Sequence, residues 1–455
     1  MNLVVFGLSM TSGWGNGHAA VYRELLRGWT RCGHEALFLE RTQPWYGKRR
    51  DLPRGGGAAV PAGFSGPRRS GFHGWDGSEQ SPGPAAEVDP PLDPSMDPSL
   101  DPSVRESAVP GFCRVGEYRD LRDLKRWVRE VACADCVLVG SHVPDGSVVG
   151  RWVQEVASGV TAFYDLDAWE TVARLERGDG QYVSAEELPG YDLYLSTTGG
   201  ALLGHMEERH GVRRACPLYP AVDCTRFFRA ISAVSSDSSD CAHPADDEAG
   251  MRWRAGTYGA YCPGRQRQLE GWLLEAARQW PEQRFVVGGG GYPAGTVWPG
   301  NVERVPELGW DQAPEFFGGM TWYFHAMRPE QRLWGGAVGL GMLEAAACGV
   351  PTITEPWEGM ERFFAPGSEI QVVRSGQEFR RVLKETSPEA LREMGGRARN
   401  RVRAEHSVGR RVLELESLIV NAAEGWRGES VMGRNGRAAS FGPMAEAMER
   451  PSGVW

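Results

Sequence analysis

Glu344 is a lone carboxylate in a small, apolar segment, residues 342–348. Gly349 and Pro351 follow this segment, and a short Thr-Ile-Thr run comes next. Glycine tolerates the left-handed conformation that ends many helices, and proline cannot continue a helix, so this order predicts a helix, a tight turn and a buried strand. At the carboxyl edge of a parallel sheet, where open α/β sheets bind ligands, the glutamate could accept hydrogen bonds from a ribose diol. The alternative is a carboxylate paired to a structural arginine.

Two further carboxylates, Asp165 and Asp167, follow an apolar run at residues 160–164. If that run is a strand, both side chains are expected to project from its end into a ligand cleft. There they could bind ligand hydroxyls or take up a proton as a general base. One of the two could instead cap the helix that follows, a common role of aspartate.

A glycine-rich loop, GWGNGH at residues 13–18, lies between the first apolar run and the first amphipathic segment. Gly15, Asn16 and Gly17 would let the backbone approach a ligand, because glycine has no Cβ, and the helix that follows offers its N-terminus to anionic or polar oxygens. His18, at the start of that helix, could serve as a base. It could equally well cap the helix or pack against it.

The same loop also suggests a dinucleotide-binding fingerprint, with Glu40 at the end of the second apolar run as the ribose ligand. Two features disfavour NAD binding. The segment between the first apolar run and the glycines is long, and the glycine spacing is GxGxG rather than GxGxxG.

Two arginines in the C-terminal half of the chain are candidate phosphate ligands. Arg265 follows the sequence Gly-Thr-Tyr-Gly at residues 256–259, and Arg328 follows an apolar run at residues 322–325. A planar guanidinium can donate two hydrogen bonds to a departing diphosphate. An exposed arginine at the start of a helix would look the same in the sequence.

Short apolar runs alternate with helical periodicities over most of the chain, which is typical of parallel sheets covered by helices. Strands are expected at residues 3–7, 35–39, 136–140, 160–164, 193–196, 285–288, 322–325 and 351–354. Helices are expected at residues 17–32, 388–405 and 408–421.

At 455 residues the chain is longer than one hydrophobic core usually supports, so two domains are expected. We predict a first domain at residues 1–225, a loose linker at 226–252, a second domain at 253–387, C-terminal helices at 388–424 and a disordered tail at 425–455. Residues 53–110 are rich in Pro, Gly and Ser and include DPSM, DPSL and DPSV repeats, so they are predicted to be a disordered insertion in the first domain.

The charge balance and the cysteines narrow the functional classes. There are 50 basic and 59 acidic side chains, a net charge of −9, which disfavours binding to nucleic acid phosphates. Nine cysteines without regular spacing are typical of a reducing compartment. No apolar run approaches the ~20 residues that span a bilayer, and the N-terminus lacks the pattern of a signal peptide. We therefore expect a cytoplasmic protein without a transmembrane segment.

The segment GMLEAAACGVPTITEPWEGMERFFAPGSEI, residues 341–370, resembles the C-terminal signature of glycosyltransferases with the GT-B fold. It is most similar to the CgeB-type (spore-maturation protein) group. The segments GLSMTSGWGNGHAAVYRELLRGW, VTAFYDLD and GYDLYLSTTGG are similar to the same group. The resemblance therefore covers most of residues 1–410.

The resemblance implies an α/β protein of two facing Rossmann-like domains whose C-terminal helix crosses back to the first domain. It also implies transfer of a sugar, such as a hexose, from a nucleotide-sugar donor to a glycan, protein or small-molecule acceptor, with no cofactor and no metal. The donor residues would be Glu344, Arg265, Arg328, Gly256, Thr257, Gly349, Glu358 and Gly359. The acceptor side would be Asp165, Asp167 and His18, with the loop of Gly15, Asn16 and Gly17.

The pair Asp165 and Asp167 also matches the D-x-D metal site of the other large glycosyltransferase fold. The GT-B resemblance disfavours that reading, because GT-B enzymes normally neutralise the leaving diphosphate with protein groups.

The chain departs from the family pattern at two positions. Gly336 stands where many nucleotide-sugar transferases have a second glutamate, and Gly341 stands where the CgeB-type group often has an arginine. A binding protein that has lost catalysis is therefore the main alternative, and a sugar-nucleotide isomerase is a less favoured one.

Overall fold

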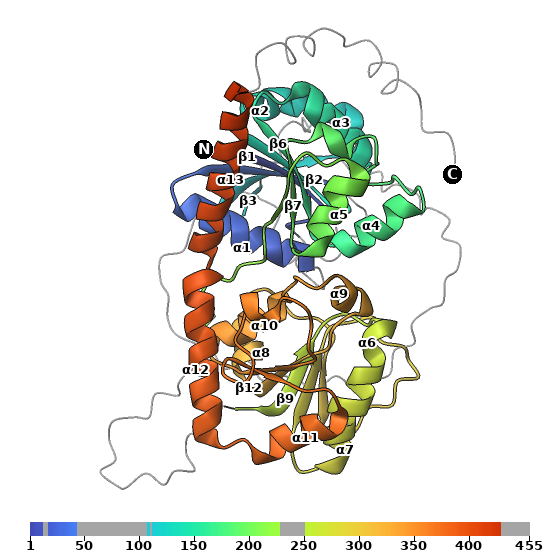
Figure 1. The fold of residues 1–455 in the computed structure, drawn as a ribbon, viewed down its shortest axis with the longest axis vertical. Helices are drawn as coiled ribbons and strands as arrows, with labels where there is room; N and C mark the ends of the chain where they lie inside the picture. Colours follow the sequence, from blue (N-terminus) through green and yellow to red (C-terminus); the bar gives the residue numbers. More distant parts are fainter. Residues whose placement is uncertain (12–16, 43–106, 110–111, 228–250, 429–455) are drawn as a thin grey trace, which may run out of the picture.

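The computed structural model describes residues 1–11, 17–42, 107–109, 112–227 and 251–428, which form two α/β domains (Figure 1). The first domain lies above the second in Figure 1, and the last two helices run along one side of both. Within these residues, no helix has the length and apolarity to span a membrane.

The first domain is built on an eight-stranded sheet with the order β3-β4-β2-β1-β5-β6-β7-β8. Neighbouring strands are parallel, except that β3 and β4 are antiparallel. The strands are β1 Asn2–Gly7, β2 Glu35–Arg41, β3 Ser107–Val109, β4 Cys113–Tyr118, β5 Cys136–Gly140, β6 Val160–Asp165, β7 Leu193–Ser196 and β8 Ala215–Pro217. The α-helices are α1 Gly17–Arg31, α2 Val128–Cys133, α3 Gly146–Val156, α4 Ala168–Glu176 and α5 Ala201–His210.

The second domain has a six-stranded parallel sheet with the order β11-β10-β9-β12-β13-β14. The strands are β9 Trp253–Tyr258, β10 Phe285–Gly288, β11 Val302–Val305, β12 Met320–His325, β13 Thr352–Thr354 and β14 Ile370–Val372. The α-helices are α6 Pro263–Gln268, α7 Glu275–Gln279, α8 Ala313–Gly318, α9 Pro329–Trp334, α10 Leu340–Ala347 and α11 Gly376–Glu385. Figure 1 shows helices on both faces of each sheet.

Both sheets are buried on two faces, which explains why their strands are continuous apolar runs. Val4 and Phe6 of β1 pack into one core cluster, whereas Leu3 and Val5 pack into the cluster on the opposite face. Successive side chains of a strand point to opposite faces, so each face of the sheet receives its own layer of helices.

The last two helices connect the domains. Helix α12 (Pro388–Glu405) packs on α10 of the second domain, and α13 (Val408–Gly428) packs on α1 of the first. On α13, Val412, Leu415 and Ile419 are buried in the same cluster as Leu25 and Trp29 of α1. The C-terminal helix α13 therefore lies against the first domain (Figure 1).

The predicted strands at 136–140, 193–196 and 285–288 are confirmed residue for residue, as is the helix at 388–405. Three predictions need correction. Residues 256–258, where no strand was predicted, form the end of β9, because they pair in parallel with residues 286–288 of β10. Residues 107–109, expected in the disordered insertion, pair with β4 as an edge strand. Residues 425–428, expected in the tail, continue α13. Most of the predicted insertion, linker and tail lies outside the described residues.

Deletion of residues 54–105 is expected to leave a protein that unfolds cooperatively, with a melting temperature within a few degrees of the full chain. Strands β2 and β4 are neighbours in the sheet, so a short linker that retains β3 spans the gap between them. The removed sequence has the composition of chain that cannot bury enough apolar surface to fold. Calorimetry of both proteins tests this. Insoluble expression, or a much lower melting temperature, would contradict it.

Candidate functional site

A cleft of about 920 Å³ separates the two domains and is lined by both. Its walls include segments at or just beyond the carboxyl ends of parallel strands, where ligands bind in open α/β sheets, together with residues of α1 and α10. In the first domain they are Leu8 after β1, Leu166 and Asp167 after β6, and Thr197 and Thr198 after β7. In the second domain they are residues 258–260 at β9, 289–291 after β10, 306–310 after β11, and His325 and Arg328 at β12.

Glu344 lies on α10, faces this cleft and is buried, with 7% of its surface exposed. Burial, reinforced by the negative charge of Glu24, raises the pKa of Glu344 to about 8, although the positive charge of Arg226 acts in the opposite direction. Among the described residues, the Glu344 side chain makes no hydrogen bond or ion pair, so no structural arginine is paired with its carboxyl group. A buried carboxylate of this kind is available to a ligand that brings its own hydroxyl donors.

The start of α10 forms the part of the cleft floor next to Glu344. Gly339 is the N-cap residue of this helix, and Gly341 is in its first turn. A Cβ on Gly341 would lie 2.4 Å from the Tyr323 hydroxyl, and a Cβ on Gly339 would lie 2.5 Å from the His325 ring. An arginine at position 341, which the CgeB-type group often has, would therefore require the Tyr323 side chain to move. Burial lowers the pKa of His325 to about 3, so its ring is neutral beside the helix N-terminus.

The two arginines predicted to contact a diphosphate both line the cleft. The Arg265 Nη2 donates a hydrogen bond of 2.6 Å to the Ala260 carbonyl oxygen, which holds the guanidinium over the loop after β9. The Arg328 guanidinium lies 5.0 Å from the ring centre of Trp169 in the first domain. This cation–π contact bridges the two sides of the cleft.

Five predicted donor residues do not line the cleft. Gly256 is inside β9, and Thr257 lines a small cavity that adjoins the cleft at Arg265. Gly349 adopts the predicted left-handed conformation, with φ of 71°, but it lies at the opposite end of the eight-residue helix α10 from the cleft, about 12 Å away along the axis. Glu358 and Gly359 pack behind the 335–336 turn, where the Glu358 carbonyl oxygen accepts a 2.9 Å hydrogen bond from the Gly336 N–H. None of these five residues lines the cleft, and their assignment to the donor site stays a prediction.

The two aspartates after β6 have different surroundings. Asp167 lines the cleft, whereas Asp165 is fully buried and does not line it. The Asp165 carboxylate accepts hydrogen bonds from the Tyr194 hydroxyl, at 2.6 Å, and from the Asp167 backbone N–H, at 3.1 Å. The prediction that both carboxylates project into the cleft is wrong for Asp165, which instead fixes the turn that presents Asp167. No side-chain capping bond from Asp167 to α4 is formed.

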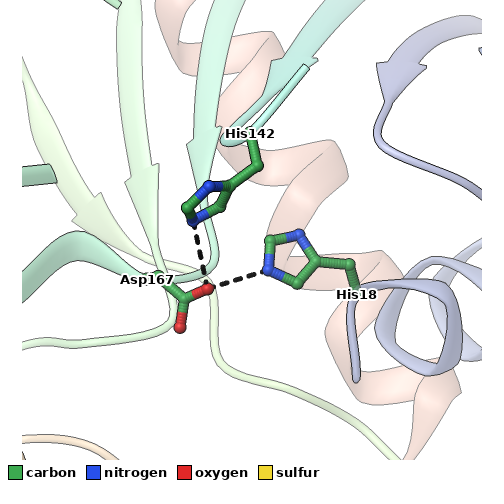
Figure 2. Close-up of side chains that lie close together, drawn as sticks. All are labelled: His18, His142 and Asp167. Atoms are coloured by element: carbon green, nitrogen blue, oxygen red, sulfur yellow. Dashed lines mark hydrogen bonds and ion pairs between the residues drawn. The ribbon is translucent and has the colours of Figure 1, made fainter. Parts of the chain in front are cut away.

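Two histidines converge on Asp167 (Figure 2). The Oδ2 of Asp167 lies 2.8 Å from Nε2 of His18 and 3.4 Å from Nε2 of His142. Burial alone would raise the pKa of Asp167, but hydrogen bonds from both rings and their charge hold it well below its usual range. Burial would lower the pKa of His142, but the hydrogen bond to Asp167 and the negative charge of that carboxylate raise it.

His142 is not among the site residues predicted from the sequence. Its position directly after the apolar run at 136–140 was the available signal, since residues beyond a parallel strand reach the ligand edge of the sheet. Of the predicted glycine loop, Gly17 begins α1 and lines the cleft. Gly15 and Asn16 lie outside the described residues.

Glu40, the ribose ligand of the NAD alternative, is buried and already bound within the protein. Its carboxylate accepts hydrogen bonds from the backbone N–H groups of Met10 and Thr11, at 2.8 and 3.1 Å, and from the Thr11 hydroxyl. It therefore holds the segment after β1 and does not face a ribose site.

Backbone contacts join the domains at the edge of the cleft. The Gly199 N–H donates a 2.8 Å hydrogen bond to the Gly336 carbonyl oxygen, and Thr198 pairs with Ala337 in an antiparallel bridge. Gly336, the first departure from the family pattern, has φ of 58° and lies against the backbone of Gly199. Glycine at this position thus permits a close contact between the domains.

Residues 265–417 match the family described as "Glycosyl transferase-like". No curated protein matches the chain. Among solved structures, the chain is similar to a sucrose-phosphate synthase from Thermosynechococcus elongatus (TM-score 0.56, 12% identity, 93% of this chain and 99% of the other). It is also similar to Anabaena HepE in complex with UDP-glucose (TM-score 0.54, 11% identity, 94% and 100%) and to an α-glucosyltransferase in complex with UDP (TM-score 0.57, 10% identity, 92% and 100%). The chain therefore has the GT-B glycosyltransferase fold, with two parallel-sheet α/β domains, and its glycosyl transferase-like segment runs from the second domain into α13.

Proposed function

We propose that this protein is a glycosyltransferase that moves a hexose from a nucleotide-sugar donor to an acceptor held on the first domain. The observation that carries the proposal is Glu344, a buried carboxylate without a protein partner among the described residues, facing the interdomain cleft beside the first turn of α10. A ribose diol supplies two hydroxyl donors to such a group. The similarity to a structure with bound UDP-glucose supports UDP-hexose as the first donor to test.

The diphosphate of the donor is proposed to lie between the first turn of α10 and the two arginines. A helix N-terminus presents unpaired N–H groups and a partial positive charge, and Gly339 and Gly341 let phosphate oxygens approach these groups closely. Arg265 and Arg328 add full positive charges. These groups bind and neutralise the leaving diphosphate without a metal or a cofactor, so a chelator is expected to leave UDP affinity unchanged.

The acceptor is proposed to enter from the side of His18 and Asp167, which line the opposite wall of the cleft. The sequence resemblance supports the CgeB-type group as the subgroup. A cytoplasmic location is supported by the free cysteines, of which Cys32 and Cys133 are exposed.

The direct test is binding and turnover of UDP-hexoses. UDP is expected to raise the melting temperature, because a ligand that binds only the native state stabilises it. Slow hydrolysis of UDP-glucose or another UDP-hexose without acceptor would identify an active transferase. Binding without turnover under any condition would identify the non-catalytic alternative, and no binding of any nucleoside diphosphate would refute the donor assignment.

Alanine at Arg265 is expected to weaken UDP binding by about tenfold, the low end of the range for a hydrogen bond to a charged group, and to leave uridine binding unchanged. The reason is that the diphosphate is the only part of UDP that the guanidinium is proposed to contact. Arg328→Ala is expected to act in the same direction. Calorimetry with UDP and with uridine measures both affinities.

Arg267→Ala is the matched control, because Arg267 is exposed on the same helix and does not line the cleft. Equal losses for UDP and uridine would show that Arg265 supports the loop rather than the diphosphate.

A further inference from the structure

Three potential metal ligands from separate elements point at one another on the first-domain side of the cleft (Figure 2). His18 lies in the first turn of α1, His142 follows β5, and Asp167 follows β6. One ring nitrogen of each histidine and one carboxylate oxygen of Asp167 all lie within 4.8 Å of one another. The three strands β1, β5 and β6 are neighbours in the sheet, which brings their following segments to one place.

The backbone holds His142 in this position at a cost. Its φ is 63°, which lies in the left-handed region of backbone conformation that residues other than glycine uncommonly adopt. The ring packs against Tyr182 with 4.5 Å between centroids, and it meets the His18 ring edge-on at 5.3 Å. Strained residues of this kind gather at functional sites, where the surrounding structure maintains them.

Asp167 is also held from behind. Its N–H donates to the buried Asp165 carboxylate, which the Tyr194 hydroxyl orients in turn. Asp167 is therefore oriented by hydrogen bonds with residues outside the cluster, as metal ligands usually are.

The spacing suits an ion of the size of Zn²⁺. Ligand atoms about 2.1 Å from a tetrahedral zinc are ~3.4 Å apart. The two histidine–aspartate separations are 2.8 and 3.4 Å, so both come close to this value with small side-chain rotations. The ring nitrogens are at most 4.8 Å apart and need to approach by no more than ~1.4 Å.

We propose that His18, His142 and Asp167 bind a divalent transition metal ion, with Zn²⁺ the first to test, and that its open coordination position faces the cleft. Two imidazoles and one carboxylate with a free position form a typical catalytic zinc set. His18 and Asp167 line the cleft, so an exogenous oxygen ligand reaches that position from the acceptor side. The ion is separate from the donor's diphosphate, which the second domain binds.

The use of the ion rests on the proposed function. An acceptor hydroxyl that binds the ion loses its proton to solvent more readily, as metal-bound water does. Its oxygen then attacks the anomeric carbon of the sugar, and the bond from that carbon to the diphosphate oxygen breaks. The electron pair of that bond leaves with the nucleoside diphosphate.

The test uses the full, untagged chain after dialysis against a chelator. Titration with Zn²⁺ in competition with a chromogenic chelator is expected to show one strong site per chain. His18→Gln, His142→Asn and Asp167→Asn are each expected to weaken it by about 10²-fold or more, since loss of a supporting residue alone costs 10- to 100-fold. Asparagine is chosen at 142 because it tolerates the left-handed backbone.

His210→Asn is the matched control, since it removes an imidazole outside the cluster. UDP affinity is expected to remain unchanged in all four variants, which separates this proposal from the donor assignment. Cobalt substitution of the wild type gives a second readout that does not depend on variants: tetrahedral N,O coordination produces visible absorption bands. No zinc site in the wild type, or equal zinc affinity in the cluster variants, would show a hydrogen-bonded cluster without a metal and overturn the proposal.

Discussion

Replacing Gly336 with alanine is expected to reduce sugar transfer by about 10²-fold, the scale of a 1 Å misplacement in a closed active site, while UDP affinity changes little. A Cβ at this position would lie 2.7 Å from the carbonyl carbon and oxygen of Gly199, and the φ of 58° is unfavourable for alanine. The contact to Gly199 joins the domains, whereas the proposed donor groups lie on the second domain alone. The substitution is therefore expected to hold the cleft open without removing a donor contact. Gly336→Glu, which restores the residue found in many relatives, is expected to be at least as damaging.

Transfer rates, or rates of donor hydrolysis, measured beside UDP affinity by calorimetry decide this prediction. Gly204→Ala is a suitable control, because it lies on α5, directly after the same contact, and has no atoms within 4 Å of an added Cβ. Small-angle scattering is expected to show a more extended particle for the Gly336 variants. Wild-type turnover in Gly336→Ala would mean that the contact between the domains is not needed for transfer.

Above pH 8, where the Glu344 carboxyl is ionised, Glu344→Gln is expected to weaken UDP binding by about 1–3 kcal/mol, or about 5- to 150-fold, because a charged acceptor of ribose hydroxyls is replaced by a neutral one. The pH dependence gives a sharper test. The pKa of Glu344 is about 8, so the carboxyl is largely protonated at neutral pH. If the ionised form accepts from ribose, UDP affinity of the wild type is expected to rise as the pH increases through 8, while the glutamine variant stays flat.

The free energy of unfolding of the free protein is expected to fall as the pH rises through 8, whereas UDP affinity is expected to rise. The folded pKa of about 8 lies above the ordinary value of 4.5, so between these values the folded state binds more protons than the unfolded state. The stabilisation from this proton is complete below pH 4.5 and is lost as the pH rises through 8. Calorimetric unfolding of the free protein at several pH values measures it, and Glu344→Gln is expected to remove this component. Affinity that falls with pH in the wild type would show that the protonated carboxyl is the form that binds. Glu330→Gln, an exposed carboxylate on α9, controls for general charge effects.

The order and type of most elements could be predicted from the sequence, because they depend on local patterns. The run CVLVG is β5 as expected, since a strand buried on both faces is apolar throughout. Gly349 ends α10 in the left-handed conformation for a local steric reason. Glu344 was identified for a similar reason, because a single carboxylate in an apolar helix is unusual wherever the helix packs.

The placement of side chains around the cleft was decided only by the tertiary structure. The local sequence does not distinguish Asp165 from Asp167. In the structure, Tyr194 on the neighbouring strand donates a hydrogen bond to Asp165, whereas Asp167 contacts the histidines. His18 and His142 are more than a hundred residues apart, and they meet because β1 and β5 are adjacent in the sheet. Gly336 is explained only by the backbone of Gly199 in the other domain. Strand order and domain contact are long-range properties, and no local periodicity encodes which segments they bring together.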